Sequence, residues 1–161
     1  MNFNFSKLFT LFLFSQGILL AHCQVPCGIY NDAARIVQLV EDFSTIQKSM
    51  GKIKELSEKK DALAMNQLTR WIMTKEEHAS KIQSVVTDYF LTQRIKVKTE
   101  GPKYDLYVEQ TLTLHQILVS AMKCKQTVDS KYVGDGLNLI ENFIALYFDE
   151  HGKNHIKQMR K

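Results

Sequence analysis

The chain has 161 residues, of which 45% are hydrophobic and 24% charged, with 21 Lys and Arg against 17 Asp and Glu. This length fits a single domain, and the apolar content argues against a disordered chain. Seven Gly and two Pro are too few for a turn-rich β-sandwich or barrel. The net charge of +4 is mild and spread along the chain, without the basic stripe of a nucleic-acid-binding protein.

Residues 1–21 have the layout of a secretory leader. Lys7 precedes a mostly apolar run from Leu8 to Ala21, after which the sequence changes abruptly to His-Cys-Gln. We therefore expect a processing protease to remove residues 1–21, leaving an exported protein of residues 22–161 in the periplasm or outside the cell, with no stable membrane insertion. The alternative is an uncleaved membrane anchor, which the short run and the absence of a basic stop disfavour.

Four stretches of the mature chain carry apolar residues three or four positions apart, as one face of a helix requires. They are Asn31 to about Ser57, about Ala62 to Thr92, Tyr104 to Lys125, and a fourth that Asp129 can cap and Gly152 ends. Asn31 or Asp32 can cap the first, while Gly134 and Gly136 weaken the first half of the fourth. The pattern predicts an all-α, antiparallel four-helix bundle over residues 31–150. A basic, frayed tail is expected over residues 151–161.

Potential metal ligands are concentrated immediately after the expected cleavage site. If cleavage leaves His22 first, its α-amine, its imidazole and the thiolates of Cys23 and Cys27 converge, and the backbone nitrogen of Cys23 can join them after losing its proton. Two nitrogens and two sulfurs in a plane suit Ni(II) or Cu(II), with the imidazole in an axial position. Pro26 fixes its own φ and Gly28 tolerates unusual φ values, so the segment can curl back on itself.

Spacing alone favours a different interpretation of the same residues. A plain Cys23–Cys27 disulfide is the ordinary expectation for an exported protein. A zinc site is a further alternative, although it usually takes four side-chain ligands.

The pattern His-Cys-x-x-Pro-Cys-Gly-x-Tyr at residues 22–30 resembles the nickel hook of nickel-dependent superoxide dismutases. Every fixed position of that motif is present, including the position of the cleavage site. Looser similarity continues along the chain at Ala34-Arg35-Ile36, Thr74-Lys75-Glu76-Glu77 and Thr87-Asp88-Tyr89-Phe90. The resemblance favours the metal site over the disulfide.

The resemblance implies a reaction and a ligand set. One superoxide reduces Ni(III) and leaves as oxygen, and a second, with two protons, reoxidises Ni(II) and leaves as hydrogen peroxide. The ligands are His22, Cys23 and Cys27, with one nickel ion per subunit of a homohexamer. Tyr30 has the catalytic position over the open face of the metal, where it orders water and limits access to small anions.

Other positions are assigned more loosely. Asp88 and Tyr89 are candidates for supporting the pocket by hydrogen bonds, or else are a surface carboxylate beside a core tyrosine. Gln24 stands where the family often has an acidic residue. Val37 and His78 stand where the family has a Glu that holds the axial imidazole and an Arg that supports it, so we expect a divergent member.

The remaining candidates are expected to be structural. Three histidines are predicted to face solvent, and a fourth, His115, to be packed or at the surface. Cys124 is predicted to be a buried free thiol. Trp71 and the methionines at helical spacing are predicted to lie in the core. The three solvent-facing histidines are His78, His151 and His155. Two functions compete with the dismutase: a secreted helical binding module with a Cys23–Cys27 disulfide, and a metal-binding homologue without turnover.

Overall fold

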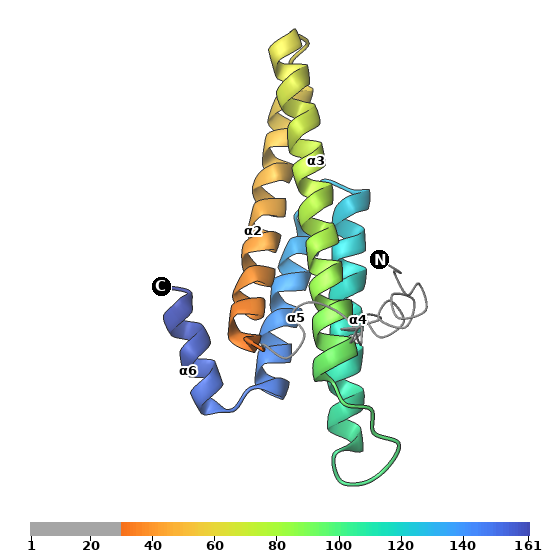
Figure 1. Ribbon diagram of the computed structural model, residues 1–161. Helices are drawn as coiled ribbons and strands as arrows, with labels where there is room; N and C mark the ends of the chain where they lie inside the picture. The colour runs from red at the N-terminus through yellow and green to blue at the C-terminus, as the bar shows by residue number, and fades with distance from the viewer. Residues whose placement is uncertain (1–29) are drawn as a thin grey trace, which may run out of the picture.

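The computed structural model describes residues 30–161, which form helices and contain no β-strand (Figure 1). The elements are α2 (Asp32–Ser57), α3 (Ala62–Ser84), the π-helix η1 (Val85–Arg94), α4 (Tyr104–Gln126), α5 (Lys131–Tyr147) and α6 (Glu150–Met159). η1 continues α3 directly, so α2, α3–η1, α4 and α5 are the four long rods of a helical bundle. The expected all-α class is confirmed. None of the helices among residues 30–161 is long and apolar enough to cross a membrane.

Side-chain caps set the start of both helices in the first hairpin. The Asn31 side chain accepts a hydrogen bond from the Ala34 backbone N–H (3.0 Å), and Asp61 accepts one from Ala64 (2.9 Å). Each cap satisfies a backbone donor that has no partner within its helix. Asn31 therefore performs the capping role, which leaves the Asp32 carboxylate available for other contacts.

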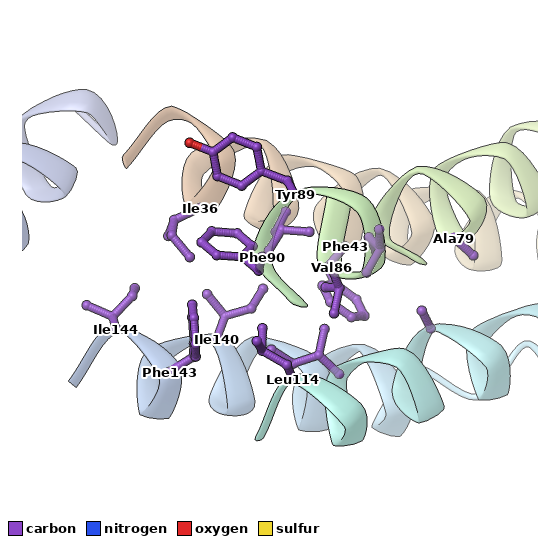
Figure 2. Close-up of a cluster of buried hydrophobic side chains, with 14 of the residues drawn as sticks. Ile36, Phe43, Ala79, Val86, Tyr89, Phe90, Leu114, Ile140, Phe143 and Ile144 are labelled. Atoms are coloured by element: carbon purple, nitrogen blue, oxygen red, sulfur yellow. The ribbon is translucent and has the colours of Figure 1, made fainter. Parts of the chain in front are cut away.

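The core is a continuous apolar cluster between the four rods (Figure 2). Phe43 from α2, Phe90 from η1 and Phe143 from α5 are fully buried, and the rings of Phe90 and Phe143 meet edge to face at 5.1 Å. Burial of these side chains is the main term that holds the rods together. The hydroxyl of Tyr89, next to Phe90, points away from this cluster (Figure 2).

The fourth helix ends earlier than expected, and the tail after it is ordered as a further helix. α5 ends at Tyr147, because Phe148 has an extended backbone and Asp149 caps a new helix by accepting from the Gly152 N–H at 2.8 Å. Gly152 thus lies in the first turn of α6 and does not end α5. Ile156 is buried against the core, so the prediction of a frayed tail was wrong.

The α2–α3 hairpin extends past α4 and α5 as an arm (Figure 1). Lys75 marks where the overlap ends, since its buried ammonium group donates to the Cys124 carbonyl at 2.9 Å, in the last turn of α4. Met65 and Met73 are 60% and 65% exposed on the α3 part of this arm, and Trp71 is half-buried. The core prediction holds for Met50, which is 1% exposed, but it was wrong for Met65 and Met73, because no other rod of the described chain covers the arm.

The close approach of α2 and α5 depends on one glycine. A Cβ placed on Gly136 would lie 2.3 Å from Cζ of Phe43, which is fully buried, whereas one on Gly134 would meet no atom within 4 Å. We expect Gly136→Ala to lower the free energy of unfolding by about 2 kcal/mol through overpacking. Gly134→Ala, its control in the same helix, should raise it by about 0.5 kcal/mol. Urea denaturation followed by circular dichroism measures both, and equal effects would contradict this packing.

Candidate metal centre

Tyr30 is the part of the hook motif that the structure describes. The predicted ligands His22, Cys23 and Cys27, together with Pro26 and Gly28, lie outside residues 30–161. Their roles therefore remain predictions, and the structure describes the surroundings of Tyr30, the last residue of the motif.

Tyr30 stands directly before α2 and is held on two sides. Its ring meets the Tyr89 ring edge-on, with centroids 6.0 Å apart, and the Arg94 guanidinium carbon lies 4.2 Å from its centroid. Such a cation–π contact is attractive even near the surface. Tyr30 nevertheless stays 45% exposed. The structure thus brings together Tyr30 and Tyr89, two residues that the sequence assigned to the site from distant positions.

The Asp32 carboxylate is the centre of this cluster. Its Oδ1 accepts hydrogen bonds from the Tyr89 hydroxyl (2.6 Å) and Arg94 Nε (2.9 Å). Its Oδ2 accepts from an Arg94 terminal nitrogen and from the Tyr147 hydroxyl, both at 2.8 Å. One carboxylate therefore joins the start of α2 to η1 and α5. Charge-assisted, two-point contacts of this kind are among the stronger ones in proteins.

The contacts shift the pKa values of Asp32 and of the two tyrosines bonded to it. Burial raises the pKa of Asp32, but hydrogen bonds from Arg94, Tyr89 and Tyr147 outweigh it and leave that pKa below its usual value. Burial and the Asp32 carboxylate raise the pKa of Tyr147 to about 12, and they raise that of Tyr89 further. Both tyrosines therefore keep their protons at neutral pH and act as hydrogen-bond donors to Asp32.

The π-helical register of η1 places Tyr89 and Arg94 on the same carboxylate. The Ile95 N–H donates to the Phe90 carbonyl at 2.8 Å, five residues back, so residues five apart lie one turn apart. In an α-helix, residues five apart point about 140° away from each other. Tyr89 and Arg94 are five apart, and both reach Asp32 because the helix is widened here.

Asp88, the other candidate supporting residue, belongs to a different set of contacts. It is half-buried, and its carboxylate lies 3.1 Å from the Thr87 hydroxyl, while its backbone carbonyl accepts from the Gln93 side chain at 2.8 Å. These contacts lie within η1 and stabilise the π-helical turn. A supporting role for Asp88 in the pocket stays a prediction.

His78, predicted to face solvent, is paired inside the α2–α3 interface. Its side chain is 23% exposed, and Nδ1 lies 2.6 Å from Oδ1 of Asp42, which is buried. Burial raises the pKa of Asp42 although the His78 contact opposes the shift. The prediction failed because the partner is a carboxylate on another helix. The Asp42–His78 pair does not include Val37, which lies five residues before Asp42 on α2.

The described part of the chain does not build a metal site of its own. Residues 30–161 contain no group of three or more His, Cys, Asp or Glu side chains able to hold a metal ion. Cys124 is a free, fully buried thiol, as predicted, and burial raises its pKa to about 11. His151 and His155 are exposed, as predicted, and His115, for which packed and surface positions were both open, is exposed too. The nitrogen and thiolate donors that suit Ni(II) are those of residues 22–27.

Sequence reasoning missed three members of the cluster at Asp32. Asp32 was considered only as a helix cap, and Arg94 lies just beyond the expected end of the second helix. Tyr147 carried the one available signal, because it lies on the apolar face of its helix and a buried tyrosine hydroxyl needs a hydrogen-bond partner. The sequence did not indicate which acceptor that partner was.

Asp32→Asn should destabilise the protein in a pH-dependent way. Loss of the charge-assisted contacts is expected to lower the free energy of unfolding by about 2 kcal/mol at pH 7. Because the pKa of Asp32 is lower in the folded than in the unfolded chain, its contribution is complete above its unfolded pKa and is lost as the pH falls through the folded pKa. The difference from wild type should therefore shrink below about pH 4.

Denaturation curves at several pH values measure this difference. The exposed Asp135→Asn on α5 is the control and should change stability little at any pH. A cost for Asp32→Asn that stays constant down to pH 3 would contradict the assignment of these contacts to the ionised carboxylate.

Comparison with known proteins assigns the chain to a family. The model of the family "Nickel-containing superoxide dismutase" matches residues 18–151, which include the hook motif, the cluster at Asp32 and the four rods. No curated protein and no solved structure matches the chain. Because the family match covers most of the sequence, the chain belongs to the nickel-containing superoxide dismutase family of oxidoreductases.

Proposed function

We propose that this protein is a superoxide dismutase whose nickel site forms after cleavage before His22. The observation that carries the proposal is the complete hook motif at residues 22–30, which lies inside the family match. His22, Cys23 and Cys27 would hold one nickel ion per subunit through the α-amine and imidazole of His22, the two thiolates and the Cys23 backbone nitrogen. Anionic sulfur and amide donors stabilise the higher oxidation state of nickel.

Bound nickel supplies the one-electron cycle that turns two superoxide ions and two protons into oxygen and hydrogen peroxide. The chain contributes the surroundings. With nickel bound, Tyr30 would lie next to the site and would restrict access to small anions. Tyr89 keeps its proton and donates it in a hydrogen bond to Asp32. This bond fixes the Tyr89 ring, which packs against the ring of Tyr30.

A basic pocket beside the cluster supports an anionic substrate. It has a volume of about 230 Å³ and shares Arg94 and Tyr147 with the contacts of Asp32. Lys96, Lys98 and Lys103 also line it, and no acidic side chain among residues 30–161 does. Positive charge gathered at a concave surface raises the local concentration of small anions.

Export and assembly complete the proposal. The leader-like run from Leu8 to Ala21 supports export, and removal of the leader would create the α-amine that the metal requires.

The apolar side chains exposed on the arm support contacts with further copies of the chain, since monomers rarely leave such patches uncovered. A homohexamer is the assembly that the family resemblance suggests.

A chain that keeps one extra residue before His22 tests the proposal. The α-amine would then be displaced by a peptide nitrogen, which is a far poorer ligand. We expect this variant to remain helical but to lose superoxide dismutation, as measured by superoxide decay after pulse radiolysis. The correctly processed chain, expressed and loaded with nickel in the same way, is the control.

The same experiment separates the rival functions. Full activity of the extended chain would contradict the amine ligand. A processed chain with an oxidised Cys23–Cys27 pair and no nickel would favour the secreted binding module. A processed chain that binds nickel without dismutation would favour the metal-binding homologue without turnover. Val37 and His78 are the reason to consider this rival, because they stand where the family has the Glu and Arg that hold the imidazole.

The basic pocket generates a second kinetic prediction. The double variant Lys98→Gln/Lys103→Gln should lower kcat/KM for superoxide roughly threefold at low ionic strength. The control Lys54→Gln/Lys60→Gln removes the same charge at the connection between α2 and α3, away from the pocket, and should have little effect. The difference should vanish as salt screens the pocket. Equal losses in the two double variants would contradict local attraction of the substrate.

A further inference from the structure

Arg94 makes two contacts that link the bundle to the last residue of the hook motif. Its guanidinium binds both carboxylate oxygens of Asp32, at 2.9 Å from Nε to Oδ1 and 2.8 Å from the terminal nitrogen to Oδ2. The guanidinium also lies over the ring of Tyr30, at 4.2 Å. The pair is only partly exposed, with 27% of the Arg94 and 15% of the Asp32 side chain accessible.

These contacts restrain the Tyr30 side chain although nearly half of its surface is exposed to solvent. Tyr30 is 45% exposed and precedes the first helical residue, so local backbone hydrogen bonds do not fix its ring. Arg94 and Tyr89 hold it from two directions, and both are bonded to Asp32, two residues further along the chain. Tyr30, Arg94, Asp32 and Tyr89 therefore form a closed set of contacts around the start of α2.

The position of Tyr30 limits the position of the metal ligands. Cys27 is three residues before Tyr30, so its Cα lies within about 10 Å of the Tyr30 Cα whatever the path of the chain. A displacement at Tyr30 therefore moves the region that a predicted thiolate ligand can reach. Residues that orient ligands in this indirect way commonly affect metal affinity.

We infer that Arg94 and Asp32 are positioning residues for the nickel site, acting through Tyr30. The pair holds the junction between the hook and α2 in one orientation. The inference rests on the proposed function for the identity of the metal, whereas the restraint of Tyr30 follows from the contacts alone. Asp32 touches neither the metal nor the substrate. Arg94 also lines the basic pocket, but hydrogen exchange and Ni²⁺ affinity do not depend on the attraction of superoxide.

The test uses two substitutions of Arg94 and one matched control. Arg94→Gln removes the charge and the two-point contact. Arg94→Lys keeps the charge but cannot bind both oxygens in the same way. Arg160→Gln removes another arginine–carboxylate pair, Arg160 to Glu141 at 2.6 Å, whose arginine is similarly exposed at 26% but which joins α6 to α5.

The first readout is hydrogen exchange of the processed, metal-free protein. Arg94→Gln should speed exchange of the backbone amides at residues 31–36 by about tenfold while leaving α4 unchanged. Arg160→Gln should leave residues 31–36 as in wild type. Wild-type exchange at residues 31–36 in Arg94→Gln would overturn the restraint itself.

The second readout is the nickel site, titrated with Ni²⁺ against a competing chelator and followed by thiolate-to-nickel absorption. Arg94→Gln should bind Ni²⁺ about tenfold more weakly with an altered spectrum, and Arg94→Lys should recover part of the affinity. Wild-type affinity and spectrum in Arg94→Gln would leave Arg94 as a structural residue and overturn the inference. Failure of wild-type protein to bind Ni²⁺ would instead contradict the proposed function, and the exchange experiment would still decide the restraint.

Discussion

The Asp32 carboxylate holds the start of α2 against η1 and α5 by hydrogen bonds from Tyr89, Arg94 and Tyr147. These three donors more than offset the loss of solvent around the carboxylate. The ionised form of Asp32 is therefore favoured over the protonated form more strongly than it is in water. Apolar packing of the rods supplies most of the folding energy, but it does not define how the chain enters the bundle. The entry point is defined by this one polar cluster, which adjoins the hook motif.

The cluster in turn depends on a departure from regular helical geometry. A continuous α-helix through residues 85–94 would direct Arg94 away from Asp32 and from Tyr30. The π-helical register turns it back toward both. Such widened turns occur frequently at functional sites, where they place a side chain that a regular helix cannot. Here the widened turn explains how a bundle built from ordinary amphipathic helices presents an arginine beside the hook.

The four rods were predictable from the sequence because their signal is local and repeated. Apolar residues three or four positions apart, from Ile36 to Ile53 for example, record directly which helix face is buried. The hook motif was readable for the same reason, since its donors lie within six residues. The contact of Arg94 with Asp32 was not, because the two lie 62 positions apart and meet only through the π-helical turn. Met65 and Met73 were misplaced because periodicity shows an apolar face without showing whether another helix covers it.

We propose above all that processing before His22 creates a working nickel site. Intact mass and metal analysis of the protein purified from its native compartment, followed by superoxide decay on the same sample, test it most directly. We expect a chain that begins at His22, carries about one nickel ion and accelerates superoxide decay. A chain two hydrogens lighter than the reduced form, without nickel and without activity even after reduction and addition of Ni²⁺, would contradict it.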